Sequence, residues 1–589
     1  MNITVQLDPV TQKNVNEWLE GSYDEKTKGA IREMLQKDPK SVVDAFFTKL
    51  TFGTAGLRGT MGIGSNRMNT YTVGAATQGL ANYILKQHKP VNGYSVLIGY
   101  DSRHHSREFA EETAKVLAGN GIKVYLYKDI RPTPLVSYGC RYKKCLSAVM
   151  ITASHNPPQY NGYKVYWFDG AQVVHPHDTG IISEAGKITD PDMVRQLSSL
   201  NSPLIEEIGT EIDDAYVKDI HTLQNYPDDN KKRGEELNVV YTSLHGTGIT
   251  LVPRVLNDWG FDSISYVEKQ IIPDGDFPTA NYPNPEEKAA MQLGVDLLLK
   301  TKGDILVATD PDADRMGVGV RKGDSVTLLT GNQILSICMA HICEALTKQK
   351  KLPEKGAFIK SIGTTELFQA ICDDYKRTCF NVLTGFKYIG EKIHEWETLA
   401  NGYQFIFGGE ESYGYLTGTF SRDKDAVVCS ALICEVALQA KLQGKTLLDD
   451  LDKLYFKYGI FEEKTVSINF SETKEGKEQM SANMDRLRKT NLKEIAGNKV
   501  VSIEDYLTST KHYLDSGKTD HLILPISDVL LYWLEDGSKA MVRPSGTEPK
   551  IKLSCGLRER KFKTIEEGIA VAKKRCDILL DFLKKELLQ

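Results

Sequence analysis

The sequence predicts an α/β protein with three α/β domains built on mainly parallel sheets, followed by a smaller α+β domain. Three observations predict this fold. At 589 residues the chain is too long for one hydrophobic core. A strand–helix–strand pattern occurs three times, each time in a different part of the chain. The last section lacks that pattern. We expect domain I at residues 1–205, domain II at 206–322, domain III at 323–455 and domain IV at 456–589.

The first strand–helix–strand unit belongs to domain I. Tyr94–Tyr100 is an apolar run typical of a buried strand, and Ile122–Tyr127 supplies the second strand. Between them Arg107–Ala118 carries apolar residues on one face and predicts a helix. Ser106 is the expected N-cap of this helix, and Gly119 is its expected stop.

The same arrangement returns in the next two domains. Their strands are as uniformly apolar as expected for parallel sheets, which are covered on both faces. The second unit consists of the strand Leu237–Leu244, a helix around Leu251–Trp259 that stops at Gly260, and the strand Ile264–Glu268. The third consists of the strand Ala357–Ile362, the helix Thr365–Tyr375 and the strand Cys379–Leu383.

The fourth domain has a different pattern. A strand is expected at Lys464–Phe470, and short strands are expected near residues 521–525 and 551–555. A long amphipathic helix is expected from about Ile565 to Leu588. Strands followed by one long helix are typical of a small α+β domain.

The composition narrows the classes of partner. The 73 basic and 78 acidic side chains nearly balance, which disfavours a nucleic-acid-binding protein. The charged stretch Tyr226–Glu236 is interpreted as a solvated loop within domain II. No apolar run approaches the ~20 residues that cross a bilayer. Met1–Glu20 lacks the apolar core of a signal peptide. We expect neither nucleic acid nor a membrane as partner.

The ten cysteines point to a reducing compartment. They form no CxxC pair. Several lie in helix-like apolar stretches such as Leu335–Cys343 and Val427–Cys434. Because buried thiols behave as small hydrophobic residues, we interpret these cysteines as reduced core residues. The prediction is a cytoplasmic protein.

One candidate site is the segment Thr152–Pro157, directly after the expected strand Ala148–Ile151. Ligands of open α/β sheets gather at the carboxyl ends of strands. Ser154 there would face a ligand, while His155 and Lys164 offer proton transfer and a positive charge for a phosphate. The alternative reading is a polar turn.

A second candidate site is the acidic segment after the expected strand Asp304–Ala308. Pro311 disfavours helical backbone before it. In an extended loop Asp310, Asp312 and Asp314 would project to one side, where three carboxylates repel unless a hard cation lies between them. Mg²⁺ suits such a site. The alternative is an acidic turn without a metal.

A calcium-binding EF-hand loop also begins with alternating acidic residues, and the sequence excludes it. Counting from Asp310, the sixth position should be glycine and is Arg315. The twelfth position should be glutamate and is Arg321.

Three further segments contain residues suited to phosphate or sugar. Arg543–Lys550 combines hydroxyls, a glycine and a guanidinium, which suits a phosphate cradle or a plain turn. Gly408–Gly414, after the expected strand Gln404–Phe407, offers carboxylate and hydroxyl groups to sugar hydroxyls. The glycine-rich segment Gly53–Gly59 carries one arginine and does not have the dinucleotide-binding spacing.

Taken together and in this order, these segments resemble the α-D-phosphohexomutase superfamily from about Phe52 to Lys552. TASHNP is similar to its phosphoserine loop, DPDADR to its metal loop, GEES to its sugar-recognition loop and RPSGTEP to its phosphate-binding loop. GTAGLRG and TASHNPPQYNGYKVYW are similar to the branch of bacterial phosphoglucomutases and animal phosphoglucomutase/phosphopentomutase enzymes. The resemblance implies four domains around a central cleft.

The resemblance also implies a role for each matching residue. Ser154 would carry the phosphate and would contact Mg²⁺ beside the three aspartates, Asp310, Asp312 and Asp314. The positive and proton-transferring groups around Ser154 would be Arg58, His155 and Lys164. Arg315, beside the metal loop, would help to hold the substrate, and Lys387 would be a further substrate-binding residue. Glu410 and Ser412 would bind the sugar hydroxyls. The distal phosphate would be bound by Arg543, Ser545, Gly546 and Thr547.

The implied function is a phosphosugar mutase that interconverts glucose 1-phosphate and glucose 6-phosphate. The expected cofactors are Mg²⁺ and glucose 1,6-bisphosphate, as activator and intermediate, and the expected assembly is a monomer or homodimer. The intermediate must turn end for end, and hinge motion of domain IV would close the cleft around it. The alternatives are a phosphopentomutase or a phosphomannomutase, and more remotely a metal-dependent phosphatase or a non-catalytic phosphosugar-binding regulator.

Overall fold

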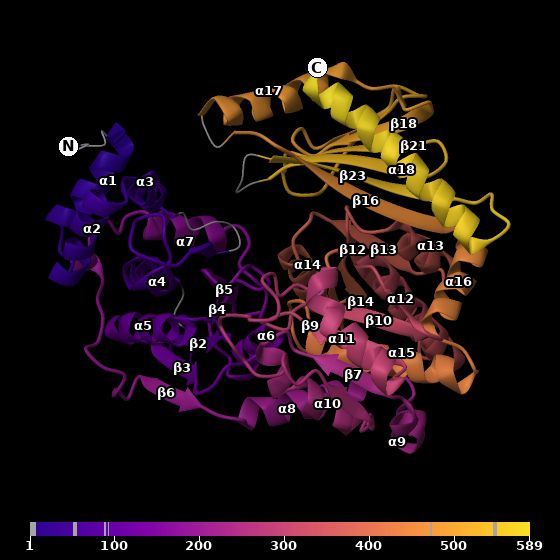
Figure 1. The fold of residues 1–589 in the computed structure, drawn as a ribbon, viewed down its shortest axis with the longest axis horizontal. Helices are drawn as coiled ribbons and strands as arrows, with labels where there is room; N and C mark the ends of the chain where they lie inside the picture. Colours follow the sequence, from indigo (N-terminus) through magenta and orange to yellow (C-terminus); the bar gives the residue numbers. More distant parts are fainter. Residues whose placement is uncertain (1–6, 51–55, 88–89, 92, 472–473, 546–549) are drawn as a thin grey trace. The chain divides into compact units, whose positions relative to one another are not determined.

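The computed structural model describes residues 7–50, 56–87, 90–91, 93–471, 474–545 and 550–589 (Figure 1). The chain divides into two compact units, which are described separately. The first unit is Met1–Ile334 together with Phe386–Gln443. The second unit is Leu335–Gly385 together with Gly444–Gln589.

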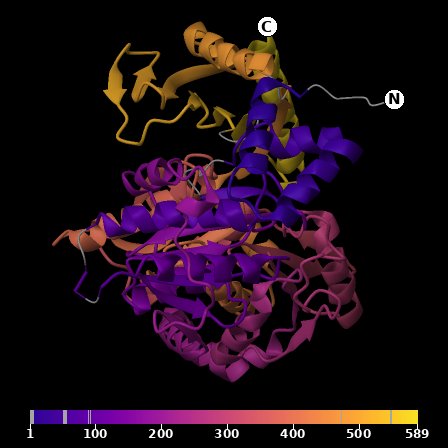
Figure 2. The same ribbon diagram turned by 90° about the vertical axis from the view of Figure 1, so that its left-hand side faces the viewer.

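The first unit begins with a small bundle of three consecutive helices, α1 (Pro9–Glu20), α2 (Glu25–Lys37) and α3 (Pro39–Phe46), which Figure 2 shows in indigo. An aspartate caps each of them by accepting hydrogen bonds from backbone N–H groups of the first turn. The bundle has its own hydrophobic core, which includes Trp18 and Phe46.

The first α/β domain contains the strand–helix–strand unit that the sequence predicts. Strand β2 pairs in parallel with β3 on one side and with β4 on the other. The sheet order is β1-β5-β4-β2-β3-β6, with β1 and β5 antiparallel to their neighbours. Its strands are β1 (Leu57–Thr60), β2 (Ser95–Tyr100), β3 (Lys123–Tyr127), β4 (Ser147–Ile151), β5 (Tyr160–Trp167) and β6 (Ile205–Ile208). Its helices are α4 (Thr70–Leu85), α5 (Ser106–Gly119), α6 (Thr133–Tyr142) and α7 (His177–Ala185).

The predicted cap of α5 is wrong. The N-cap is His105, whose φ of 61° places it in the left-handed region, and no side chain caps the helix. Ser106 is the first helical residue, and its Oγ donates a hydrogen bond to Asp101 at 2.7 Å. The hydroxyl that could have capped the helix therefore orients a buried carboxylate instead.

The next α/β domain has the sheet order β11-β10-β9-β7-β8. Strand β7 is parallel to β8 and β9, and Gly260 ends helix α10 in the left-handed region, as the sequence predicts. The strands are β7 (Val239–Thr242), β8 (Ile264–Tyr266), β9 (Ile305–Thr309), β10 (Met316–Lys322) and β11 (Ser325–Leu328). The helices are α8 (Glu211–Ile220), α9 (Pro227–Arg233), α10 (Val252–Trp259) and α11 (Lys288–Thr301).

Helix α9 corrects the prediction that Tyr226–Glu236 is a loop. Pro227 is at its first position, acidic residues occupy its first turn and basic residues its last turn. This order of charges complements the helix dipole, and a 3-10 turn (Gly234–Glu236) follows. The segment is charged because it is a surface helix.

The last part of the first unit contains the antiparallel pair β14 (Gln404–Glu410) and β15 (Gly414–Thr417) and the helices α14 (Lys387–Thr398) and α15 (Ala426–Leu442). The expected strand Gln404–Phe407 extends three residues further, so Glu410 ends the strand and does not lie in the loop. Helix α15 is buried on almost every face. Within the described ranges no single helix is both long and apolar enough to span a membrane, and α15 reaches that level only together with α16 (Leu447–Tyr458).

The second unit contains the third predicted strand–helix–strand unit. Strand β12 (Gly356–Ser361) is parallel to β13 (Thr378–Val382), with α13 (Glu366–Asp374) between them in the chain. The unit also contains α16 and most of α12 (Gly331–Lys348), which begins in the first unit.

The C-terminal domain is an antiparallel sheet covered by helix α18 (Ile565–Leu588), which packs on β16 and β23 (Figure 1). Strands β16 and β23 and helix α18 are at their predicted places. The short strand expected near residues 521–525 is present slightly earlier in the chain, as β20. The sheet order is β16-β23-β22-β21-β18-β19-β20, with β17 on β18. Its elements are β16 (Ile460–Asn469), α17 (Lys474–Thr490), β17 (Glu494–Ile495), β18 (Asn498–Asp505), β19 (Thr510–Tyr513), β20 (Thr519–His521), β21 (Leu530–Leu534), β22 (Lys539–Pro544) and β23 (Lys550–Glu559).

The thiol prediction is confirmed. All ten cysteines are free, and all except the partly buried Cys379 are buried.

Candidate active site

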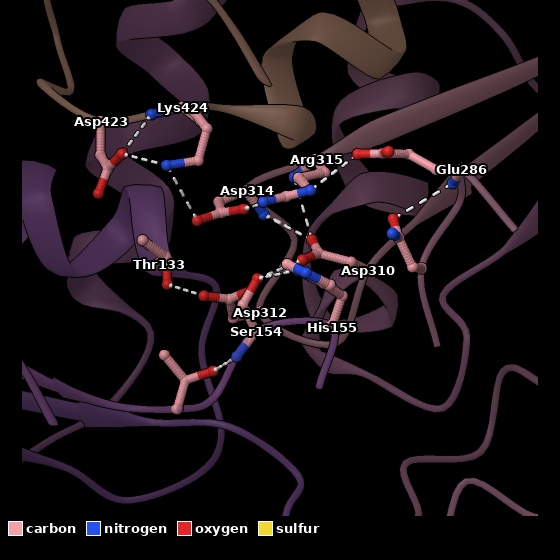
Figure 3. A network of polar contacts seen from close by, with 12 residues as sticks. Thr133, Ser154, His155, Glu286, Asp310, Asp312, Asp314, Arg315, Asp423 and Lys424 are labelled. Atoms are coloured by element: carbon pink, nitrogen blue, oxygen red, sulfur yellow. Dashed lines mark hydrogen bonds and ion pairs between the residues drawn. The ribbon is translucent and has the colours of Figure 1, made fainter. Parts of the chain in front are cut away.

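Ser154 lies just beyond the end of β4. Its side chain is turned toward the metal-loop turn, residues 310–315, which carries the three aspartates (Figure 3). Its Oγ donates a hydrogen bond of 2.8 Å to Oδ2 of Asp310 and lies 3.1 Å from Nδ1 of His155. Its backbone is left-handed, with φ of 54°, and its N–H donates to Oγ1 of Thr152. Ser154 is only 3% exposed, so it lies deeper than an exposed loop residue.

The three aspartates lie on the connection between the antiparallel strands β9 and β10. Their carboxylate oxygens come within 4.8 Å of one another, and all three side chains are buried. The loop is a tight turn and not the extended segment that the spacing predicts: Ala313 has φ of 49°. Oδ1 of Asp310 accepts hydrogen bonds from the backbone N–H groups of Asp314 and Arg315, at 3.1 and 3.0 Å.

Two lysines lie against these carboxylates. Nζ of Lys164, on β5, is 2.7 Å from Asp312 and 3.1 Å from Asp314. Nζ of Lys424 is 3.3 Å from Asp314 (Figure 3). The expected repulsion among the aspartates is therefore balanced in part by protein cations, which corrects the sequence argument that only a bound cation could relieve it.

The pKa values follow this charge arrangement. Burial, together with the charges of Asp312 and Asp314, raises the pKa of Asp310 well above its ordinary value. Burial would also raise the pKa of Asp314, but Lys164, Lys424 and Arg315 lower it below its ordinary value. Burial would lower the pKa of Lys164, yet the two carboxylates raise it. Lys164 is therefore a fixed positive charge at neutral pH.

The donor set fits a divalent cation. Oδ1 of Asp312 and Oδ1 of Asp314 are buried and have no hydrogen-bond partner within the part of the chain that the structure describes. Buried carboxylate oxygens without partners are costly, and hard cations are bound by such oxygens. With the oxygens of Asp310 and Ser154, the cluster could hold a metal ion.

Two further residues of this site have no counterpart among the sequence predictions. Thr133 holds Asp312 through its backbone N–H, which donates to the carbonyl, and its Oγ1, which donates to Oδ2, both at 2.8 Å. Thr133 begins α6 shortly after the parallel strand β3. Residues at the carboxyl ends of such strands often line a binding site, so this position could have marked Thr133 as a candidate. Lys424 forms an ion pair with Asp423 at 2.9 Å. The spacing of charged residues around Lys424 matches no known type of site, so the sequence did not predict its role.

The other predicted groups near Ser154 lie around this cluster. Arg58, on β1, is exposed and donates a hydrogen bond to the side chain of Asn156 at 3.2 Å. Arg315 forms an ion pair with Glu286 at 2.9 Å (Figure 3). Burial and the nearby charges of Arg315 and Arg58 lower the pKa of His155 well below its ordinary value, so its imidazole is neutral at pH 7.

The predicted sugar-binding residues also belong to the first unit. Glu410 is buried at the end of β14. Burial would lower the pKa of Lys424, but the charges of Asp314, Asp423 and Glu410 raise it above its ordinary value. Ser412 follows it in the partly buried turn before β15. Lys387 is the first residue of α14. Its Nζ lies 3.6 Å from the buried carboxylate of Asp178 on α7.

The predicted phosphate-binding segment belongs to the second unit. Arg543 is near the end of β22, and the backbone N–H of Ser545 donates to the carbonyl of Lys550 at 2.8 Å. Gly546 and Thr547 lie outside the described residues.

Three parts of the chain match one protein family in sequence. Residues 49–192, 214–323 and 330–458 match, in this order, the alpha/beta/alpha domains I, II and III of phosphoglucomutase/phosphomannomutase. Together these ranges cover more than half of the chain. The chain belongs to the phosphoglucomutase/phosphomannomutase family. It is therefore an enzyme that transfers phosphate within its substrate, as the resemblance implied.

Relatives of this family match nearly the whole chain. A phosphoglucomutase of Staphylococcus aureus (strain USA300) is 36% identical over 94% of this chain and 97% of its own length. That of Staphylococcus haemolyticus is 37% identical over 89% of this chain and 93% of its own length.

Solved structures of the family share the fold. Parafusin (phosphoglucomutase) from Paramecium, in its open form, has a TM-score of 0.67 at 16% identity and covers 91% of this chain and 95% of that one. A putative phosphomannomutase from Thermus thermophilus has a TM-score of 0.65 at 20% identity, covering 91% and 99%. Three α/β/α domains with partly parallel sheets and a β-rich C-terminal domain thus confirm the predicted fold class.

Proposed function

We propose that this enzyme interconverts glucose 1-phosphate and glucose 6-phosphate, with Ser154 as the transient phosphate carrier. The observation that carries the proposal is the hydrogen bond from Ser154 to Asp310 inside a buried cluster of three carboxylates. The relationship to staphylococcal phosphoglucomutases along almost the full length supports glucose as the sugar.

In the proposed reaction the free hydroxyl oxygen of the sugar phosphate attacks the phosphorus of phosphorylated Ser154. The new oxygen–phosphorus bond forms as the bond from phosphorus to Oγ of Ser154 breaks, and the electron pair stays on Oγ. His155 is the proposed proton carrier at Ser154, because its neutral imidazole lies 3.1 Å from Oγ. It would take the proton of Oγ when Ser154 attacks a phosphate of the bisphosphate. In the step described here Oγ would regain a proton through His155, and the proton of the attacking hydroxyl would leave to solvent. Lys164 stays protonated and supplies positive charge.

The metal proposed for the aspartate cluster is Mg²⁺, held by Asp310, Asp312, Asp314 and the oxygen of Ser154. When bound, it would neutralise negative charge on the phosphoryl group. Arg58 is exposed beside the serine loop and would add a guanidinium to the same phosphoryl oxygens.

The remaining predicted residues would hold the sugar phosphate. Glu410 and Ser412 would accept hydrogen bonds from sugar hydroxyls, and Arg315 and Lys387 would contact the substrate. The segment with Arg543, Ser545, Gly546 and Thr547 would bind the phosphate that is not transferred. The proposed intermediate is glucose 1,6-bisphosphate, which also restores the phosphate on Ser154. The ten free thiols support a cytoplasmic location.

A coupled assay tests the substrate. Glucose 1-, mannose 1- and ribose 1-phosphate are compared at equal concentration, each with and without a bisphosphate activator, while free phosphate is measured in parallel. We expect the highest kcat/KM with glucose 1-phosphate and a stimulation by glucose 1,6-bisphosphate. A higher value with the pentose or mannose phosphate would reassign the sugar. Release of free phosphate faster than formation of the isomer would contradict the mutase reaction itself.

Replacement of the carrier hydroxyl tests the mechanism. Ser154→Ala should lower kcat by at least about 10³-fold, because no other group can replace a nucleophile in a two-step transfer. It should also abolish incorporation of ³²P from labelled glucose 1,6-bisphosphate. Ser183→Ala, an exposed serine on α7, is the control and should keep both properties. Stable labelling of Ser154→Ala protein would contradict the assignment.

A further inference from the structure

We propose that Arg103 is a positioning residue for the phosphoryl transfer: it holds the loop that carries Ser154 in the one conformation that directs Oγ at Asp310. The inference rests on the proposed role of Ser154. Among the described interactions, Arg103 forms no hydrogen bond or ion pair with the three aspartates, although the charges of Asp312 and Asp310 act on it.

The guanidinium of Arg103 binds four carbonyl groups of the Ser154 loop. Nη2 donates to the carbonyls of Ser154 and Asn156, both at 2.5 Å. Nη1 donates to the carbonyls of Pro157 and Tyr160, at 2.8 and 3.1 Å. One rigid, planar group thus fixes the whole segment from the serine to the start of β5.

The surroundings of Arg103 hold the guanidinium in place. Its side chain is fully buried, and Nε is 3.3 Å from Oδ2 of the equally buried Asp101. Oδ1 of Asp101 accepts hydrogen bonds from the backbone N–H of Arg103 and from Oγ of Ser106. The ring of Phe277 lies under the guanidinium, 4.8 Å from its centre. Little freedom is left to this side chain, so the carbonyls it binds are held firmly.

The Ser154 loop needs such support because its backbone is unfavourable on its own. Ser154 has a left-handed φ of 54°, a conformation that costs an L-residue free energy and persists only when the surroundings impose it. In this conformation its carbonyl points into the interior, where an unpaired carbonyl is unfavourable. Arg103 supplies the donor for that carbonyl, while Thr152 accepts from the N–H of Ser154.

The segment that carries Arg103 also contacts the loop beside the metal-loop turn. Oγ of Ser102 donates to the carbonyl of His245 at 2.8 Å. Two residues later Thr247 donates from its N–H and its Oγ1 to the carbonyl of Pro311, at 2.7 and 2.9 Å. Hydrogen bonds at Ser102 and Thr247, joined by short stretches of backbone, therefore connect the segment that carries Arg103 to the loop that carries the aspartates.

The test separates phosphoryl transfer from binding. The rate of ³²P transfer from glucose 1,6-bisphosphate to Ser154 is measured in a single turnover, and the Kd of glucose 6-phosphate is measured by calorimetry on the dephosphorylated enzyme. For Arg103→Met we expect transfer at least about 50-fold slower, with the Kd within about threefold of wild type. A residue that merely stabilises the fold would change both quantities together or neither.

Two variants control for the loss of an arginine that binds backbone carbonyls, although Arg321 is partly buried and Arg103 is fully buried. Arg321→Met removes a guanidinium that also donates to three backbone carbonyls, those of Lys302, Gly303 and Gly323, away from the serine loop. This variant should keep the transfer rate. Arg103→Lys keeps the charge but can reach fewer of the carbonyls, so its transfer rate should lie between those of Arg103→Met and wild type.

The possible results decide the matter. Transfer within threefold of wild type in folded Arg103→Met overturns the inference, and so does a Kd that weakens as much as the rate. If Arg103→Met does not fold, Arg103→Lys and Phe277→Leu replace it, and wild-type transfer in both overturns the inference. Failure of the proposed function would look different, because the wild-type enzyme itself would then take up no label on Ser154.

Discussion

Asp312 and Asp314 each use one carboxylate oxygen on a lysine and keep the other buried without a hydrogen-bond partner among the described residues. Lys164 and Lys424 thus make the cluster tolerable to the fold without occupying every oxygen. Part of the charge balance of the cluster therefore comes from the chain itself, and the proposed cation would not be the only positive charge beside the three aspartates.

Asp312→Asn should weaken Mg²⁺ binding by about 100-fold, measured by titration calorimetry, because it removes one carboxylate charge from the proposed ligand set. Asp324→Asn is the control: this aspartate is exposed on the turn between β10 and β11. An unchanged Mg²⁺ titration in Asp312→Asn would show that the ion binds elsewhere.

Among single residues, the sequence identified those that belong to short motifs. The resemblance to the family implied that Ser154 lies beside the three aspartates, and these side chains do lie together. Spacing could not show Thr133, Lys424 or Arg103, because each reaches the site from a distant segment and acts through a contact that only the folded chain creates. It also gave the wrong reason for the convergence of the aspartates, which comes from a turn.

Among the secondary elements, the approach of two loops shapes the metal-loop turn. The backbone at Gly246 lies so close to Pro311 that a Cβ built on the glycine would be 2.2 Å from the proline Cα. Backbone atoms cannot move aside as a flexible side chain can. The absence of a side chain at Gly246 is therefore a condition for the position of the loop that carries Asp310 and Asp312.

Gly246→Ala should displace Pro311 and weaken Mg²⁺ binding by at least about tenfold, as changes just outside a metal's ligands do. The measurement is again calorimetry. Gly209→Ala is the matched control, because a Cβ there would meet only the end of the Glu211 side chain, at 3.7 Å. Equal Mg²⁺ affinity in the two variants would mean that the turn tolerates the shift.

In the second unit a buried ion cluster joins β22 to the segment before α13. Nζ of Lys539 donates to the carbonyls of Ile362 and Thr364, and both Lys539 and Lys360 contact Glu366, at 2.7 and 2.8 Å. Burial would raise the pKa of Glu366, but the two lysines lower it to about 2.

Glu366→Gln should therefore destabilise the second unit in a pH-dependent way. The folded-state pKa is below the unfolded value, so the carboxylate's contribution is full above the unfolded value of 4.5 and is lost as the pH falls toward about 2. A shift of this size corresponds to about 3 kcal/mol. Urea unfolding at pH 7 and pH 3 should show a large difference from wild type at pH 7 and a smaller one at pH 3.

The exposed Glu354 provides the control, since Glu354→Gln should unfold like wild type at both pH values. A difference between Glu366→Gln and wild type that stays constant with pH would contradict the charge argument.

The secondary elements were predictable where one local pattern decided them. The strand–helix–strand units were found because buried parallel strands are apolar throughout and Gly260 marks a helix end. The C-terminal sheet was found only in part. Strands such as β19 and β20 are short and partly exposed, so their residues resemble those of loops. Pairing with distant strands, which no local pattern reports, determines them.

For the molecule as a whole, the composition correctly predicted that the cysteines are free. The order of the motifs correctly predicted the family. The sequence did not predict which chain segments belong to which of the two compact units, because this division depends on contacts between residues far apart in sequence. Leu335–Gly385 and the C-terminal part form one unit, while Phe386–Gln443 returns to the first.

That return has a consequence for biosynthesis. A ribosome makes the chain from its N-terminus, so Leu335–Gly385 is synthesised before the segment that completes the first unit. Until Gln443 is made, the first unit lacks helix α15, which is buried against α10, and Asp314 lacks Lys424. Nascent chains stalled at Ile334 should bind chaperones more strongly than chains stalled well beyond Gln443, which crosslinking on the ribosome can measure. Equal crosslinking would mean that the first 334 residues already cover their apolar surface.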